Sequence, residues 1–174
     1  DVMVVFDEAY IEFCRDPEAA DGLLTYPKHD NLAVLRTFSK AYGLAGLRVG
    51  YAIAQPPVIE ALNKTALPFG VSVIAQAAAA ASLADDSELR ARVDALVTQR
   101  TQVIDGLRDA GVEVLASEAN FIWLPLGDAT EDFAQRSEAA GLTVRAFPGE
   151  GVRVTIAEPP ATDRFIEFAA NFAK

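Results

Sequence analysis

Residues 32–54 have the sequence LAVLRTFSKAYGLAGLRVGYAIA, in which two apolar segments flank a glycine-rich middle. The segments 32–38 and 49–54 are short, apolar and bounded by turn-forming residues, so each predicts a buried β-strand. Lys40 comes directly after the first segment, and Gly43 and Gly46 permit a turn behind it. This stretch therefore predicts a strand, a turn that carries a lysine, and a second strand.

Upstream of this stretch, residues 1–6 (DVMVVF) form another continuous apolar run. Such a run is typical of a strand that is buried on both faces, as in a parallel sheet. A buried strand at the first residue would lack its neighbours, so we expect a piece of a longer protein that begins in the middle of a sheet. Asp7 follows at the carboxyl end of the strand, where open α/β sheets bind ligands, and Tyr10 comes three residues later. An Asp that only caps a turn is the alternative.

The remainder of the chain predicts alternating helices and strands. A helix from Pro56 to about residue 64 is followed by an alanine-rich helix over 71–83. Asp85 and its two successors suit the N-terminus of a long helix to about residue 110. After it we expect strand 112–115, strand 120–125, helix 130–140, strand 142–146, strand 151–156 and helix 162–173. The change in pattern predicts an α/β fold with two domains, residues 1–85 and 86–174.

Composition limits the classes of function. The chain has 174 residues, 51% of them hydrophobic, and 15 Lys and Arg against 25 Asp and Glu give a net charge of −10. An acidic chain without a basic block is a poor partner for nucleic acid. Cys14 and His29 are the only residues of their types, so we expect no disulfide and no metal site. No apolar run reaches the ~20 residues of a membrane span, and we expect no membrane partner and a cytoplasmic location.

The lysine turn carries the chemistry. A lysine directly behind an apolar strand suggests a partly desolvated amine, which a Schiff-base nucleophile needs. Thr37 and Ser39 place hydroxyls beside Lys40, and Arg48, across the turn, offers the planar fork that grips a phosphate. A solvated lysine in a flexible loop is the alternative that these residues leave open.

The combination of Asp7-Glu8-Ala9-Tyr10 with Ser39-Lys40 and Gly46-Leu47-Arg48-Val49-Gly50-Tyr51 resembles the core of the fold-type-I pyridoxal-phosphate aminotransferases. Within them it is most similar to the histidinol-phosphate and aromatic amino acid aminotransferase family. The resemblance spans the whole chain and corresponds to the C-terminal half of a family member. It implies the last part of the large cofactor-binding domain, a mostly parallel sheet with helices, followed by a small C-terminal α/β domain.

The resemblance also implies roles for individual residues. Lys40 would hold pyridoxal 5′-phosphate as a Schiff base and move the proton of the substrate. Asp7 would pair with the pyridine nitrogen, and Tyr10 would hydrogen-bond the phenolic oxygen. The cofactor phosphate would be bound by Thr37, Ser39 and Arg48.

Two further residues resemble substrate-binding positions of the family. Arg153 lies between apolar residues in the predicted strand 151–156, where an arginine is costly unless it faces an anion. The resemblance implies that it pairs with the α-carboxylate of the substrate, with an exposed strand face as the alternative. Asn120 would lie near the same carboxylate, although an Asn that only leads into a strand is nearly as good an account.

The resemblance implies an aminotransferase that moves an amino group between an aromatic L-amino acid, such as phenylalanine or tyrosine, and a 2-oxo acid. Histidinol-phosphate aminotransferase of histidine biosynthesis is the first alternative. The second is an inactive half-protein, because the family places a glycine-rich phosphate loop and a ring-stacking aromatic residue upstream. A decarboxylase or lyase of the same fold type would also use Lys40 and Asp7. Family members are homodimers, so we expect a homodimer for the full-length protein.

Overall fold

The computed structural model describes residues 2–84 and 86–172. The chain divides into two compact units, Asp1–Arg92 and Val93–Lys174. The long helix α4 (Ser87–Asp109) contains the division between them. Asp85, which we expected at the N-terminus of this helix, lies outside the described residues, as do Asp1 and Ala173 at the ends of two other predicted elements.

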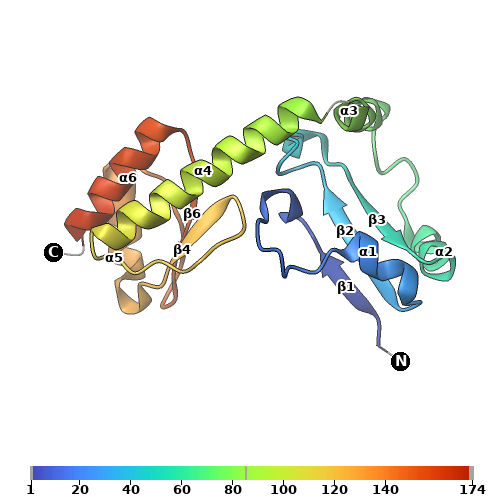
Figure 1. The fold of residues 1–174 in the computed structure, drawn as a ribbon, viewed down its shortest axis with the longest axis horizontal. Helices are drawn as coiled ribbons and strands as arrows, with labels where there is room; N and C mark the ends of the chain where they lie inside the picture. The colour runs from blue at the N-terminus through green and yellow to red at the C-terminus, as the bar shows by residue number, and fades with distance from the viewer. Residues whose placement is uncertain (1, 85, 173–174) are drawn as a thin grey trace. The chain divides into compact units, whose positions relative to one another are not determined.

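The first unit contains a three-stranded sheet in the order β1-β2-β3, drawn in blue to cyan in Figure 1. β1 (Val4–Asp7) runs parallel to β2 (Leu32–Thr37), with Asp7 opposite Leu35. β3 (Gly50–Ala54) runs antiparallel to β2, with Gly50 opposite Thr37. The parallel pair brings the carboxyl ends of β1 and β2 to the same end of the sheet.

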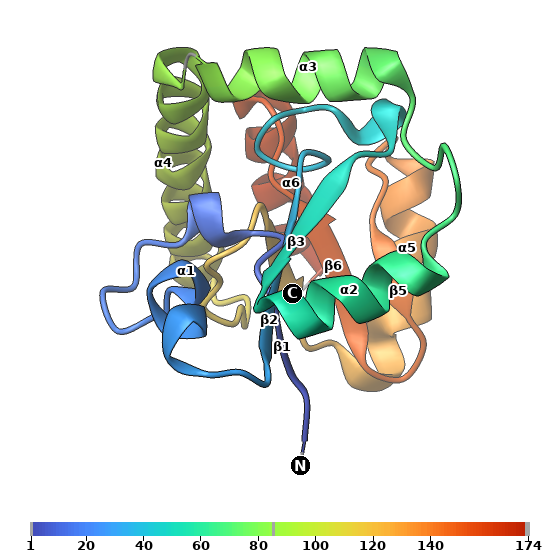
Figure 2. The same ribbon diagram turned by 90° about the vertical axis from the view of Figure 1, so that its right-hand side faces the viewer.

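Helices complete the first unit: α1 (Gly22–Thr25), α2 (Pro56–Thr65) and α3 (Val73–Ala84). Figure 2 shows α3 lying across the loop that joins β2 to β3. Ala75 and Ala79 of α3 pack there against Phe38 and Val49 at the two ends of the loop. The small alanine side chains allow this close approach, so α3 supports the segment that carries Lys40.

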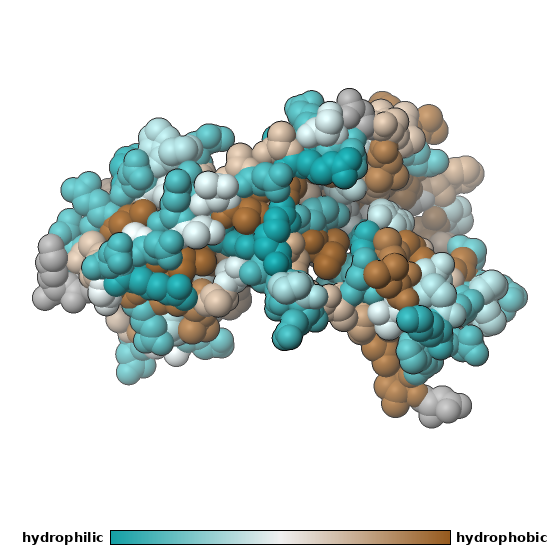
Figure 3. Space-filling model, viewed as in Figure 1, coloured by the Kyte–Doolittle hydropathy of each residue, from teal (hydrophilic) through white to brown (hydrophobic). Residues whose placement is uncertain are grey.

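The burial expected for the first strand is wrong for the described chain. Val4 and Val5 of β1 are 40% and 52% exposed, and Figure 3 shows a brown apolar strip along this strand. β1 is the edge strand of the sheet, and no described residue continues the sheet beyond it. The apolar pattern of residues 1–6 therefore describes a strand made for burial that this chain alone does not bury.

The second unit contains an antiparallel three-stranded sheet in the order β4-β6-β5. Its strands are β4 (Phe121–Leu124), β5 (Arg145–Phe147) and β6 (Gly151–Thr155), and its other helices are α5 (Thr130–Ala139) and α6 (Pro159–Phe172). One core joins the three helices to the sheet; among its members are Leu107 of α4, Phe133 of α5, Phe165 of α6, Ile122 and Leu124 of β4, and Val152 and Val154 of β6. The mixed α/β fold predicted from the sequence is confirmed.

Three predicted elements of the second unit differ from the structure. The strand predicted over 142–146 is β5, which begins only at Arg145. Residues 112–115 form no strand, although Val112 and Val114 are buried and the Leu115 amide donates to the Trp123 carbonyl. Their alternating apolar pattern is satisfied by packing into the core rather than by pairing in the sheet. Helix α6 begins at Pro159, three residues before the predicted start, because proline is favourable in the first turn of a helix.

Helices suited to membrane insertion were not found: within residues 2–84 and 86–172, none is both long and apolar enough to cross a bilayer.

Candidate active site

The predicted phosphate-binding residues lie together at the end of the first sheet. Thr37, Ser39 and Arg48 line one surface depression of about 430 Å³ between β2 and β3. The Ser39 amide donates to Thr37 Oγ1 at 3.1 Å, and Arg48 Nη1 donates to Ser39 Oγ at 3.4 Å. Two hydroxyls and one guanidinium therefore face the same space, a donor set that matches the acceptor oxygens of a phosphate.

The backbone around Arg48 explains how its side chain returns to the depression. Arg48 has left-handed backbone angles (φ 54°, ψ 51°), and its Nη1 also donates to the Ala45 carbonyl at 2.8 Å. A non-glycine residue in this region costs about 1–2 kcal/mol, which the surrounding structure must offset. Residue 50, two positions later, is a glycine, because a Cβ there would lie 2.8 Å from the Arg36 carbonyl. This local strain is consistent with a constrained binding loop.

Lys40 lies beside Tyr10, a residue that the family resemblance places in the same site. The Lys40 Nζ is 5.4 Å from the centre of the Tyr10 ring, within the range of a cation–π contact. The expected desolvation of the amine is wrong for this chain, because Lys40 is exposed. The turn behind it is closed by a bond from the Gly43 amide to the Lys40 carbonyl, with Gly43 at φ 71°.

Asp7 lies at the carboxyl end of β1, on the same edge of the sheet as Thr37. Its carboxylate is exposed and accepts a hydrogen bond from the Ala9 amide at 3.2 Å. This bond caps the turn after β1, which is the alternative role considered for Asp7. One carboxylate oxygen can cap the turn while the other remains open to a ligand.

A buried ion pair behind this edge was missed by sequence reasoning, which gave Glu8 no partner. The Glu8 carboxylate accepts from Arg36 at 2.9 Å, and both side chains are largely buried. The signal was available, because Arg36 is the one charged residue in an otherwise apolar strand pattern. Nearby, burial raises the pKa of Glu12.

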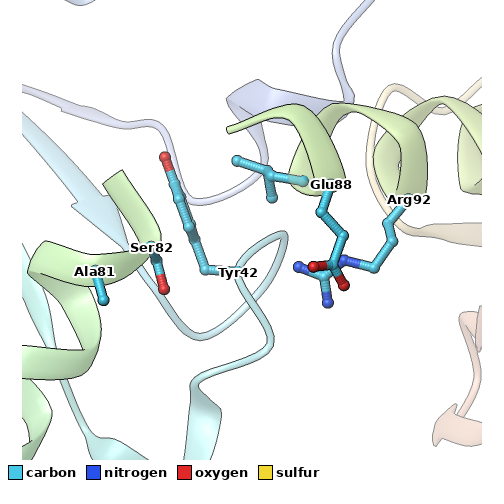
Figure 4. Close-up of a pocket in the computed structure, with 6 residues that line it drawn as sticks. Tyr42, Ala81, Ser82, Glu88 and Arg92 are labelled. Carbon is cyan, nitrogen blue, oxygen red and sulfur yellow. The ribbon is translucent and has the colours of Figure 1, made fainter. Parts of the chain in front are cut away.

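A second pocket of about 310 Å³ adjoins the lysine loop and is drawn in Figure 4. Tyr42, Ser82, Glu88 and Arg92 line it, and none of them is a predicted site residue. Burial raises the pKa of the Tyr42 phenol, and the Tyr42 ring packs 4.7 Å from that of Phe38. Tyr42 thus anchors the loop two residues after Lys40.

In the second unit, Arg153 lies on the face of the sheet opposite the helical core. It is half-buried in β6, with its guanidinium 5.0 Å from the centre of the Phe121 ring. Trp123 of β4 and Arg145 of β5 are its neighbours in register. Trp123 alternates with the buried Ile122 and Leu124 and therefore lies on this other face. Arg145 was missed by sequence reasoning.

Asn120 immediately precedes β4, and its carbonyl accepts from the Ile156 amide at 3.0 Å. The loop before it is held by Arg100, which donates to the Ala119 carbonyl at 2.9 Å and to Glu118 at 3.0 Å. The backbone of Asn120 is therefore fixed. These contacts of Arg153 and Asn120 are made with residues of the second unit.

Known proteins share this arrangement of sequence and fold. The sequence profile of the family "Aminotransferase class I and II" matches residues 1–166. The chain belongs to this aminotransferase family. An aromatic amino acid aminotransferase of Streptomyces avermitilis is 58% identical over 174 residues, which are 100% of this chain and 48% of that protein. One from Mycobacterium tuberculosis is 51% identical over 171 residues, 98% of this chain and 48% of that protein.

Solved structures agree with the family. A histidinol-phosphate aminotransferase from Sinorhizobium meliloti, in complex with pyridoxal-5′-phosphate, superposes with a TM-score of 0.84 at 30% identity, covering 97% of this chain and 48% of that one. A protein of Erwinia carotovora atroseptica, provisionally assigned as a histidinol-phosphate aminotransferase, gives 0.90 at 28% identity, covering 98% and 51%. The chain thus spans about half the length of the relatives that it matches.

Proposed function

We propose that this chain is the lysine-bearing half of a pyridoxal-phosphate-dependent aminotransferase that acts on aromatic L-amino acids and 2-oxo acids. The observation that carries the proposal is the grouping of Thr37, Ser39 and Arg48 around one depression, next to the exposed amine of Lys40. The names of the relatives at 51–58% identity support the aromatic substrate.

The donor set suits pyridoxal 5′-phosphate. Thr37, Ser39 and Arg48 would hold its phosphate, Asp7 would pair with its ring nitrogen, and Tyr10 would donate to its phenolic oxygen. When bound, the cofactor supplies a carbonyl that condenses with the substrate amine and a ring that accepts electrons from the substrate Cα. The negative charge of Asp7 favours a protonated ring nitrogen, which strengthens that electron acceptance.

Lys40 would anchor the cofactor and act as the general base. Its amine is close to the Tyr10 ring and is exposed, so it can reach a bound ligand. As a base, it would move a proton from the substrate Cα to the C4′ carbon of the cofactor in one half-reaction, and in the opposite direction in the other. Arg153 would bind the α-carboxylate through its planar fork, with Asn120 as a further hydrogen-bond donor.

Histidinol phosphate is the second candidate substrate, and one observation favours it. Arg145 lies opposite Arg153 in register on the same face of the sheet. Two neighbouring guanidiniums offer more donors than a single carboxylate needs. They suit the larger set of acceptor oxygens on a phosphate monoester. A panel of phenylalanine, tyrosine and histidinol phosphate separates the candidates. Arg145→Met should selectively impair histidinol phosphate if that compound is the substrate.

The decisive experiment is covalent trapping. The absorbance of the 174-residue chain is recorded with and without pyridoxal 5′-phosphate, followed by borohydride reduction and peptide mapping. The same is done with a chimaera that joins the preceding half of the Streptomyces avermitilis relative to this chain. We expect the label on Lys40 and its loss in Lys40→Ala. The exposed Lys64 provides the control, because Lys64→Ala should leave the label in place.

A band from the chimaera but not from the chain would favour an incomplete half-enzyme. A label on another lysine, or no band from either protein, would contradict the proposal.

We also propose that the full-length protein is a homodimer. Exposed apolar side chains such as Leu67 and Phe69, between α2 and α3, and Ile74, in the first turn of α3, suit the subunit interface of a homodimer. The cytoplasmic location and the lack of nucleic-acid and membrane partners stay predictions from the sequence.

A further inference from the structure

We propose that the buried Glu8–Arg36 ion pair is a positioning device that holds Asp7 and Thr37 in the geometry needed to bind the cofactor. The inference rests on the proposed function and assigns a role to two residues that do not themselves touch the ligand.

The pair is a closely specified contact. Arg36 Nε and Nη2 lie 2.9 and 2.8 Å from Glu8 Oε2, and the side chains of Arg36 and Glu8 are 16% and 6% exposed. The other oxygen, Glu8 Oε1, accepts from the Gly22 amide at 2.6 Å. A Cβ on residue 22 would lie 2.6 Å from this oxygen, so glycine is required there. Three donors thus converge on one buried carboxylate.

The place of the pair in the sheet connects it to the site. Glu8 follows Asp7 at the end of β1, and Arg36 precedes Thr37 at the end of β2. The Glu8 amide also donates to the Leu35 carbonyl at 2.9 Å. Successive side chains of a strand point to opposite faces, so Arg36 lies on the other face from Thr37. Asp7 is in register with Leu35 and therefore shares the face of Thr37.

The ion pair consequently ties β1 to β2 from behind, immediately beside the two residues that would contact the cofactor. Asp7 would pair with the ring nitrogen of the cofactor, and Thr37 would bind its phosphate. These two groups lie at opposite ends of one rigid molecule. A change in the spacing of the two strand ends would spoil one contact or the other. The pair fixes this spacing both through side chains and through the backbone bond of Glu8.

A buried ion pair is a poor device for stability alone, because desolvation offsets most of the attraction and an apolar pair often serves as well. The pair also fixes the orientation of the two side chains, because a planar guanidinium binds a carboxylate only within a narrow range of positions. Burial lowers the pKa of Arg36, but the hydrogen bond and charge of Glu8 more than offset this and raise it, so the guanidinium stays charged. Asp21, 3.5 Å from Arg36, adds to the same charge balance.

The test uses the chimaera described above, in four forms: wild type, Arg36→Lys, Arg36→Met, and the double variant Glu8→Met/Arg36→Met. Each is assayed for the dissociation constant of pyridoxal 5′-phosphate, the pH titration of the visible band of the bound cofactor, kcat and KM, and Tm. Lys64→Met, which removes an exposed pair within one helix, is the control and should change none of these.

We expect Arg36→Met to weaken cofactor binding by roughly 10-fold or more, as loss of a supporting contact does at other binding sites. The pH titration of the band should shift, because Asp7 is no longer held against the ring nitrogen, and Arg36→Lys should recover part of the affinity. The double variant should regain part of the Tm lost in Arg36→Met, since no charge is left buried alone, although the Gly22 amide loses its acceptor; it should retain the weakened binding.

Recovery of both Tm and cofactor affinity in the double variant would show that the pair is only structural, which overturns the inference. An unchanged titration and dissociation constant in Arg36→Met would overturn it as well. If Arg36→Met fails to fold, the double variant carries the test alone. A wild-type chimaera that binds no cofactor would instead overturn the proposed function, and the inference with it.

Discussion

The two units of the chain differ in how completely each buries its own apolar residues. The second unit packs three helices and a sheet around one core, in which Leu107, Ile122 and Leu124 are fully buried. The first unit leaves Val2, Val5 and Phe69 on its surface. Among the described residues, every large exposed apolar side chain except Leu115 belongs to the first unit. The second unit therefore has the buried core of an independent domain, whereas the first unit has exposed apolar surface that other contacts can cover.

The difference matters for function because the candidate cofactor residues are all in the less complete unit. Lys40, Asp7 and Arg48 are exposed there, in a setting that water reaches. A cofactor site works best where water is excluded, since electrostatic interactions are stronger in a dry environment. The comparison predicts that further protein covers the first unit, while the second unit needs little more than itself.

The largest expected effect is the loss of a core aromatic side chain. Phe133 is 1% exposed, and its ring contacts those of Phe165, Phe168 and Phe172. Phe133→Ala should lower the free energy of unfolding of the second unit by about 3–5 kcal/mol. Denaturant unfolding of the chain, followed by the fluorescence of Trp123 in the same unit, measures it.

Val5→Ala in the first unit is the matched comparison. Val5 is 52% exposed, so its truncation should change stability by less than about 0.5 kcal/mol in the isolated chain. In the chimaera with the preceding half of a relative, the same substitution should cost about 1 kcal/mol or more, because the side chain becomes covered. Equal small effects in both proteins would refute the view that the first unit is completed by further chain.

Glycine positions give the next largest contrast. A Cβ at Gly151 would lie 2.2 Å from the Leu124 carbonyl and 2.8 Å from the Trp123 ring. Gly151→Ala should therefore destabilise the second unit by about 1–3 kcal/mol, as overpacking does. Nothing lies within 4 Å of a Cβ at Gly46, so Gly46→Ala in the first unit is the control. Thermal melts of both variants test this, and similar losses would contradict it.

A smaller effect is expected for Arg100, which joins α4 to the loop before Asn120. Arg100→Met removes the donors to Glu118 and to the Ala119 carbonyl and should cost about 1–3 kcal/mol. Faster hydrogen exchange should be confined to residues 117–120. Arg90→Met, at an exposed pair one helical turn apart, should cost less than about 0.5 kcal/mol. A loss as large for Arg90 as for Arg100 would contradict the role of burial.

The same contrast explains what the sequence could and could not predict. The strands around Lys40 were predictable because apolar runs and turn residues agree locally, and β2, β3 and α2 lie within a residue or two of their predicted ranges. The grouping of Thr37, Ser39 and Arg48 followed from the two strands being adjacent. Burial was not predictable for β1, since an apolar pattern shows what a strand is suited to and not what covers it.

The residues that sequence reasoning missed depend on cross-strand register. Glu8 pairs with Arg36, and Arg145 lies beside Arg153, only because particular positions of different strands come into register. Local pattern carries no information on register between strands that are far apart in the chain. The same limit applies to Trp123, whose face was set by the strand pairing rather than by its apolar character.

The smallest expected effect concerns Glu12, a charged residue in the less complete unit. Burial raises its pKa above the ordinary value of 4.5; a backbone hydrogen bond and the charge of Arg36 oppose the shift, and the charge of Glu8 adds to it. A carboxyl group whose pKa is raised by folding stabilises the fold fully below its unfolded pKa. That stabilisation is lost as the pH rises through the folded pKa.

Glu12→Gln should therefore raise Tm at pH 7 and leave it nearly unchanged at pH 4. Glu113→Gln, at an exposed position of the second unit, should change Tm little at either pH. An equal gain for Glu12→Gln at both pH values would show that ionisation is not the cause. In the chimaera the gain at pH 7 should grow, because any protein that covers the first unit removes water from this carboxylate as well.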